Sequence, residues 1–163
     1  MFTDVSMQAM CASAYLSNED GQHLLIAKSR LPSIQSHHTI PKLEMMAITM
    51  GVRLALNTYL EVKTQIEITV VCILSDSGIA LSWVKAPPNT KNTGVLVANR
   101  VKEIIKITRR LEEEGAKVRF GYVNTKDNPA DEGTRGSDAK RFADSLWWTG
   151  PEGSELAGRL WSP

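Results

Sequence analysis

The chain has 163 residues, 42% of them hydrophobic and 23% charged, which is the balance of one globular domain and too short for two full-sized ones. The net charge of +1 excludes nucleic-acid binding through overall basicity, so any such binding has to come from local basic clusters. We expect residues 1–151 to form one domain and residues 152–163 to form a tail or linker.

The sequence predicts neither a membrane span nor a targeting signal. The longest apolar stretch, residues 70–74 with the flanking Ile66 and Ile68, is far shorter than the roughly 20 residues of a membrane helix. The first six residues lack the basic and apolar succession of a signal peptide, so we expect an intracellular chain. Cys11 and Cys72 lie in apolar, strand-like runs, which favours reduced thiols over a disulfide. The spacing of the histidines does not predict a zinc site.

The chain begins with residues that favour extended structure. Residues 2–16 are read as extended, and a strong turn signal follows at residues 18–21. Residues 23–28 should pair back as the second arm of a hairpin. Residues 29–39 lack periodicity and predict a loop.

A long helix is expected next, because Pro41 is a favoured residue in the first turn of a helix. Its inward-facing stripe, spaced at three and four residues, consists of Glu44, Ala47, Ile48, Gly51, Ala55 and Thr58. The helix therefore presents a carboxylate, Glu44, on the face that would pack on a sheet.

The middle of the chain predicts a central strand and two more helices. Residues 66–74 are rich in β-branched residues and almost uniformly apolar at their end, as is typical of a strand covered on both faces. A short helix is expected at residues 77–84, followed by a polar break at residues 89–94. A longer helix then has the apolar stripe Val97, Val101, Ile104, Thr108 and Leu111, and on its other side the basic residues Lys102, Lys106, Arg109 and Arg110.

The last third of the chain adds a strand and a helix. Residues 118–123 alternate as a strand, and Asn128 and Pro129 have the pattern of the cap and first position of a last helix. The whole order of elements fits a mixed sheet with helices on its faces. We therefore predict an α/β or mixed α+β fold.

Four acids stand at positions that permit a shared site. Asp4 lies in the first strand, Glu44 on the inner face of the first long helix, Asp76 at the exit of the central strand, and Asp131 in the first turn of the last helix. Several carboxylates are what two divalent cations about 4 Å apart require. Taken singly, Asp76 is better explained as the cap of the helix after it, and Asp131 as a favourable charge at the positive N-terminus of the last helix. Glu44 is harder to explain structurally, because a carboxylate on an apolar face is costly without a partner.

Particular motifs decide between these interpretations. They are FTDVS at residues 2–6, IPKLE at 40–44, SDS at 75–77 with LSWV at 81–84, VANRV at 97–101, NPAD at 128–131 with RG at 135–136, and LWWTGP at 146–151. In this order they resemble the ribonuclease H domain of BEL/Pao-type long-terminal-repeat retrotransposons over nearly the whole chain. The resemblance implies the ribonuclease H-like fold, a five-stranded mixed sheet with three antiparallel strands followed by two parallel ones, flanked by helices.

The resemblance also implies a two-metal phosphodiester hydrolase. It implies that Asp4 bridges two Mg²⁺ ions, that Glu44 and Asp76 share one of them, and that Asp131 helps to hold the other, with Mn²⁺ as an alternative metal. Water activated by the ions then attacks the phosphate in line, with no covalent enzyme intermediate.

The implied substrate is the RNA strand of an RNA–DNA hybrid formed in reverse transcription. Its recognition is expected through 2′-hydroxyls and backbone rather than base sequence. By their helical position, Lys102, Lys106, Arg109 and Arg110 are candidates for contacts with the DNA strand, although a solvated charged face is the structural alternative. The implied partner is a reverse transcriptase domain of the same polyprotein, in the cytoplasm or in virus-like particles, and no membrane partner is expected.

Two departures from related enzymes qualify the resemblance. The loop before the last acid lacks the histidine of many cellular and retroviral relatives, with Lys126 as the substitute considered, and only three residues precede Asp4, which suggests a shortened first strand. The main alternative is a catalytically inactive ribonuclease H-like domain that binds nucleic acid or a polymerase. A transposase or integrase core is a weaker alternative, because it uses a late helical glutamate where this chain has the early Glu44.

Overall fold

The computed structural model describes residues 1–32, 38–151 and 160–163. The strands are β1 (Phe2–Val5), β2 (Met10–Asn18), β3 (Gly21–Arg30), β4 (Val70–Ser75) and β5 (Lys117–Tyr122). The helices are α1 (Ile40–Val62), α2 (Gly78–Lys85), α3 (Thr90–Thr93), α4 (Val95–Glu113), α5 (Glu132–Arg135), α6 (Ala139–Ala143) and α7 (Leu146–Thr149), and the 3₁₀ turns are η1 (Thr125–Asp127) and η2 (Pro129–Asp131). Within these residues, no helix has the length and apolar character needed to span a membrane.

The five strands form one mixed sheet in the order β3-β2-β1-β4-β5. β1 pairs antiparallel with β2, and β2 pairs antiparallel with β3, whereas β4 is parallel to both β1 and β5. The short strand β1 thus lies in the centre, with all four of its residues buried. This arrangement confirms the predicted ribonuclease H-like fold.

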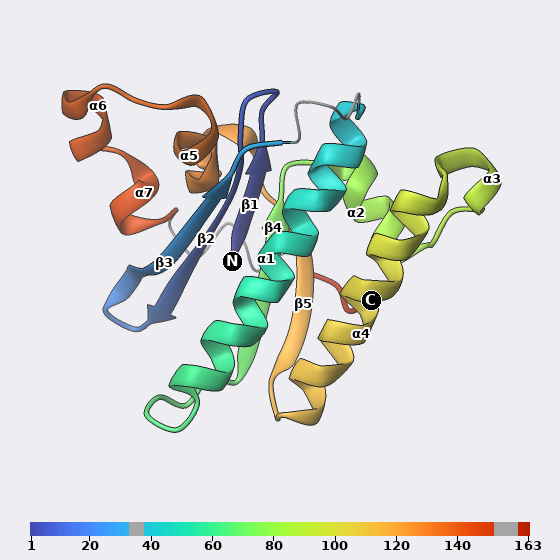
Figure 1. Ribbon diagram of the computed structural model, residues 1–163. Helices are drawn as coiled ribbons and strands as arrows, with labels where there is room; N and C mark the ends of the chain where they lie inside the picture. The colour runs from blue at the N-terminus through green and yellow to red at the C-terminus, as the bar shows by residue number, and fades with distance from the viewer. Residues whose placement is uncertain (33–37, 152–159) are drawn as a thin grey trace.

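Helices α1, α2 and α4 cover one face of the sheet. Figure 1 shows α1 lying across the sheet with α4 beside it. The core on this side joins buried residues of α1 such as Ile48 and Val52 to Ile73 of β4 and Phe120 of β5. A Cβ at Gly51 would overlap the side chain of Thr3, so the missing side chain lets α1 approach β1 closely.

The other face of the sheet is covered by the last part of the chain. Phe2, Leu74 and Ala130 form a second buried cluster here, with Trp147 of α7 packed against it. The hydroxyl of Tyr15 in β2 donates a hydrogen bond to the carbonyl of Trp147 at 2.7 Å. This hydrogen bond holds α7 against β2.

Several predicted boundaries differ from the observed ones. The first extended stretch is broken by a turn between β1 and β2, in which the Ser6 hydroxyl accepts hydrogen bonds from the backbone of Gln8 and Ala9 at 3.1 Å. The central strand begins at Val70 rather than at Ile66, which is 38% exposed. The expected break at residues 89–94 contains the single turn of α3.

The ends of two predicted elements also need correction. Tyr59, rather than Thr58, is the buried residue near the end of the α1 stripe. The expected last helix is instead η2 followed by the four residues of α5, which ends at Gly136 with φ of 74°. The loop predicted at residues 29–39 begins later, since β3 continues to Arg30, and residues 33–37 lie outside the described part.

The chain returns to the sheet edge after residue 159. Trp161 forms an antiparallel bridge with Phe120 of β5, with two backbone hydrogen bonds of 2.7 and 2.8 Å, and its ring stacks on that of Phe120. Residues 152–159 of the predicted tail lie outside the described residues, and the domain boundary at residue 151 stays a prediction.

Candidate metal centre

Asp4 lies in the middle of the sheet and is almost fully covered. Its residue is 4% exposed, and one carboxylate oxygen accepts a hydrogen bond from the hydroxyl of the buried Thr134. Burial raises the pKa of Asp4 to about 6, against the hydrogen bond from Thr134, and the negative charges of Asp76 and Asp131 add to the rise. The carboxylate of Asp4 is therefore held in a fixed position, and its environment disfavours the negative charge unless a cation is nearby.

Asp76 follows β4 directly and reaches the same place. In the parallel pairing of β1 with β4, Thr3 lies opposite Ser75, so the register brings Asp76 next to Asp4. The hydroxyl of Thr125 donates a hydrogen bond of 2.7 Å to one oxygen of Asp76. The carboxyl end of a central strand thus supplies the second acid.

Glu44 comes to this end of the sheet from the N-terminal part of α1. It is 8% exposed, as the inward stripe of the helix predicts. Burial raises the pKa of Glu44 to about 8, with further contributions from the charges of Asp76 and Asp4. A buried acid with two acidic neighbours is stable as an anion only when a cation joins it.

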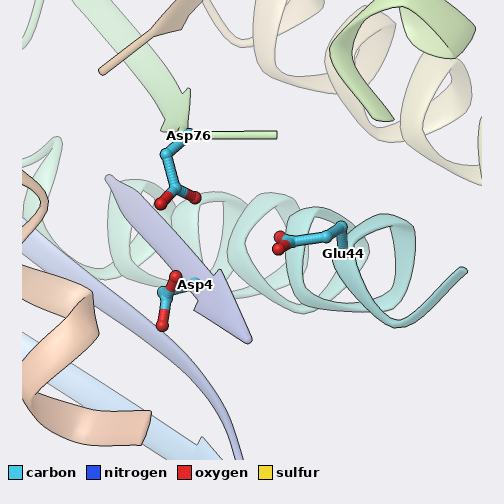
Figure 2. Close-up of side chains that lie close together, drawn as sticks. All are labelled: Asp4, Glu44 and Asp76. Carbon is cyan, nitrogen blue, oxygen red and sulfur yellow. The ribbon is translucent and has the colours of Figure 1, made fainter. Parts of the chain in front are cut away.

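The three carboxylates point toward one common space (Figure 2). One oxygen from each of Asp4, Glu44 and Asp76 lies within 4.8 Å of the other two. Glu44 Oε2 and Asp76 Oδ1 are buried without a hydrogen-bond partner in the described part of the chain. Clustered oxygen donors with unfilled acceptor capacity fit a hard divalent cation such as Mg²⁺, which binds through carboxylate oxygens.

Asp131 lies beside this group but is not one of the three. Its carboxylate is close enough to affect the pKa of Asp4, and it forms an ion pair of 2.7 Å with Arg135. The turn η2 that carries it is tied to β1, because the side chain of Asn128 donates a hydrogen bond of 3.1 Å to the carbonyl of Thr3. The structure thus brings together three of the four predicted acids and sets the fourth at their edge.

The structure tests the structural alternatives for the two later acids. Ser77, not Asp76, caps α2, because its hydroxyl accepts a hydrogen bond from the backbone N–H of Ala80 at 3.3 Å. Asp131 lies at the start of α5, as the helix N-terminus alternative predicts. It makes no side-chain capping hydrogen bond there and pairs with Arg135.

Sequence reasoning missed the side chains that hold the acids in place. Thr134 and Thr125 carried no signal, because a threonine in a polar segment has no distinctive spacing. Asn128 was identified only as a helix cap, and it does accept a hydrogen bond from Ala130, but its bond to β1 depends on tertiary contacts. Lys126, the considered substitute for a histidine, is 75% exposed and lies 3.9 Å from Asp127.

The predicted basic stripe lines a shallow groove on the outer side of α4. The groove is lined by Lys102, Ile105, Lys106, Arg109, Arg110 and Glu113. Arg110 forms ion pairs with Glu113 and Glu114. In the described part of the chain, Lys102, Lys106 and Arg109 have no acidic group within 4.0 Å.

A second basic groove was not predicted, because its residues come from four separate elements. Its lining includes methionines, and its cationic residues are Lys28, Arg30, Arg53 and Arg100. Both Arg53 and Arg100 pair with Glu103, the latter at 2.8 Å. The second groove is therefore partly neutralised by its own acid.

Comparison with known proteins gives a family match for the first part of the chain. Residues 1–77 match the family model described as Pao retrotransposon-like RNaseH-like domain. The matched stretch contains Asp4, Glu44 and Asp76, and Asp131 lies beyond it. The curated proteins gave no match. The family supports a nuclease-like function in retrotransposons. The match supports, over residues 1–77, the resemblance predicted from the motifs.

Proposed function

We propose that this chain is a metal-dependent endoribonuclease that cuts the RNA strand of RNA–DNA hybrids during retroelement reverse transcription. One observation carries the proposal: Asp4, Glu44 and Asp76 come from three different elements and place carboxylate oxygens within 4.8 Å of one another. Such an arrangement is costly to fold without a cation and is what two-metal phosphodiester hydrolysis requires.

Each acid has a distinct part in this proposal. Asp4 lies close to Glu44 and Asp76 and is also affected by the charge of Asp131, so it would contact both cations. Glu44 and Asp76 would hold one cation, and Asp131 would help to hold the other. When bound, Mg²⁺ or Mn²⁺ ions activate water and stabilise the charges on the attacking and leaving oxygens of the phosphate. Thr134 and Thr125 keep the carboxylates of Asp4 and Asp76 in fixed orientations through their hydrogen bonds.

We further propose that the hybrid lies across this end of the sheet, with its DNA strand toward the groove of α4. Lys102, Lys106 and Arg109 would contact the backbone phosphates, which carry no base information. A reverse transcriptase domain of the same polyprotein is the proposed partner, because the hybrid is the product of that activity.

The test uses the purified chain and a hybrid whose RNA strand is labelled. Cleavage should require Mg²⁺ or Mn²⁺, and Asp76→Asn should lower the rate by at least about a hundredfold, because it removes a charged metal ligand at almost unchanged volume. Asp20→Asn is the matched control, since Asp20 is exposed in the β2–β3 turn. Far-UV circular dichroism of both variants checks that the fold is kept.

Two results would contradict the proposal. One is undiminished cleavage by Asp76→Asn, and the other is equally fast cutting of the same RNA as a single strand. Metal-independent binding of the hybrid with no cleavage under any condition would favour the inactive-domain alternative.

A further inference from the structure

Arg135 forms an ion pair with Asp131, the acid at the edge of the carboxylate group. It ends α5 four residues after Asp131, so one helical turn brings its guanidinium back to that carboxylate. The Nε of Arg135 lies 2.7 Å from Oδ1 of Asp131. The Arg135 side chain is 62% exposed, whereas that of Asp131 is 18% exposed, so the guanidinium approaches from the side of the solvent.

The other three acids are in the opposite situation. In the described part of the chain, Asp4, Glu44 and Asp76 have no lysine, arginine or histidine within 4.0 Å. A divalent cation that binds between these three carboxylates therefore does not have to displace a basic side chain. A cation that also binds Asp131 has to compete with the guanidinium of Arg135, which is already paired with that carboxylate.

We propose that Arg135 is a positioning residue that competes with the second divalent cation for Asp131. The inference rests on the proposed function and deepens it. Arginine is always charged, and its ion pair with Asp131 has to be given up or weakened before the carboxylate can bind a metal. The chain therefore binds two divalent cations with different affinities. The ion pair of Arg135 with Asp131 lowers the affinity of the site that includes Asp131, which is the weaker of the two.

The test measures Mn²⁺ binding to the full chain, by calorimetry and by the electron paramagnetic resonance signal of free Mn²⁺. In Arg135→Gln the weaker Mn²⁺ site should tighten by about fivefold, the size of effect expected for an exposed ion pair. Arg135→Lys keeps the positive charge and should keep the weaker site close to its wild-type affinity. Arg141→Gln is the matched control, since Arg141 is 65% exposed and lies 3.5 Å from Glu132, the neighbouring acid.

The possible results separate this inference from the proposed function. A weaker site of the same or lower affinity in Arg135→Gln overturns the role of Arg135, while tight binding at the first site leaves the proposed function standing. Equal tightening in Arg141→Gln also overturns it, because the effect then reflects net charge alone. Absence of any Mn²⁺ binding by the wild-type chain overturns both.

Discussion

Glu44 shows at the scale of one residue how the site depends on pH. The pKa is raised from 4.5 to about 8 in Glu44 and from 3.8 to about 6 in Asp4. Between the ordinary and the raised pKa values, the folded metal-free chain therefore binds more protons than the unfolded chain. Its free energy of unfolding should fall as the pH rises from about 4 to about 8. Glu44→Gln should recover on the order of 2 kcal/mol near pH 8.5, because it removes a buried charge without a partner.

Urea denaturation at several pH values, with and without Mg²⁺, measures this effect. Mg²⁺ should stabilise the wild-type chain more at pH 8 than at pH 5.5, because a cation has to displace the protons held by these acids. Glu67→Gln in an exposed position is the control. Stability of the metal-free chain that increases steadily over this pH range would be incompatible with the raised pKa values.

The four acids could be singled out from the sequence because the motifs around them resemble one family, and Glu44 also because it stands on the inner face of a predictable helix. The residues that orient them could not. Thr134 acts on Asp4 through a hydrogen bond that forms only when α5 folds onto β1. A sequence pattern records periodicity along one element, and it carries no information on such contacts between elements.

At the scale of elements, the long helices and central strands were predictable and the region after β5 was not. In α1 and α4 apolar residues recur at intervals of three and four positions, because one face of each long helix is buried. This spacing can be recognised over many residues of the sequence. The segment of α5 to α7 consists of helices of four or five residues, too short for such a pattern. Their positions depend on packing against β2 and β3.

Gly133 is the point where α5 touches β2. A Cβ at this position would overlap Sγ of Cys11 and lie 3.1 Å from the ring of Trp147. Gly133→Ala should therefore push α5 off the sheet, lower the free energy of unfolding by about 1–3 kcal/mol and reduce cleavage through the displacement of Asp131 and Thr134. Urea denaturation and cleavage rates measure the two effects.

Two further variants make the Gly133 prediction specific. Gly78→Ala is the control, because nothing lies within 4 Å of a Cβ at that position at the start of α2. Cys11→Ala combined with Gly133→Ala should restore part of the lost activity, since it removes the sulfur that the new methyl group meets. If Gly133→Ala is as stable and as active as Gly78→Ala, then α5 is not held by this contact.

At the scale of the whole molecule, the charge is nearly balanced and its distribution decides where nucleic acid binds. With a net charge of +1, only local grooves offer an excess of positive charge. The groove on α4 contains Lys102, Lys106 and Arg109 without acidic partners among the described residues, whereas two arginines of the second groove share Glu103. We therefore expect the α4 groove to contribute more to hybrid binding.

The salt dependence of hybrid binding tests this expectation. With Asp76→Asn as the background to prevent cleavage, each lost phosphate contact should reduce the slope of log affinity against log salt by roughly 0.7–0.9. The pair Lys102→Gln and Lys106→Gln should therefore reduce the slope by about 1.5 and weaken binding regardless of base sequence. The pair Lys28→Gln and Arg30→Gln removes the same charge from the second groove and should change the slope less. If the slope changes more in this second pair of variants, the DNA strand binds in the groove between α1 and β3 instead of the α4 groove.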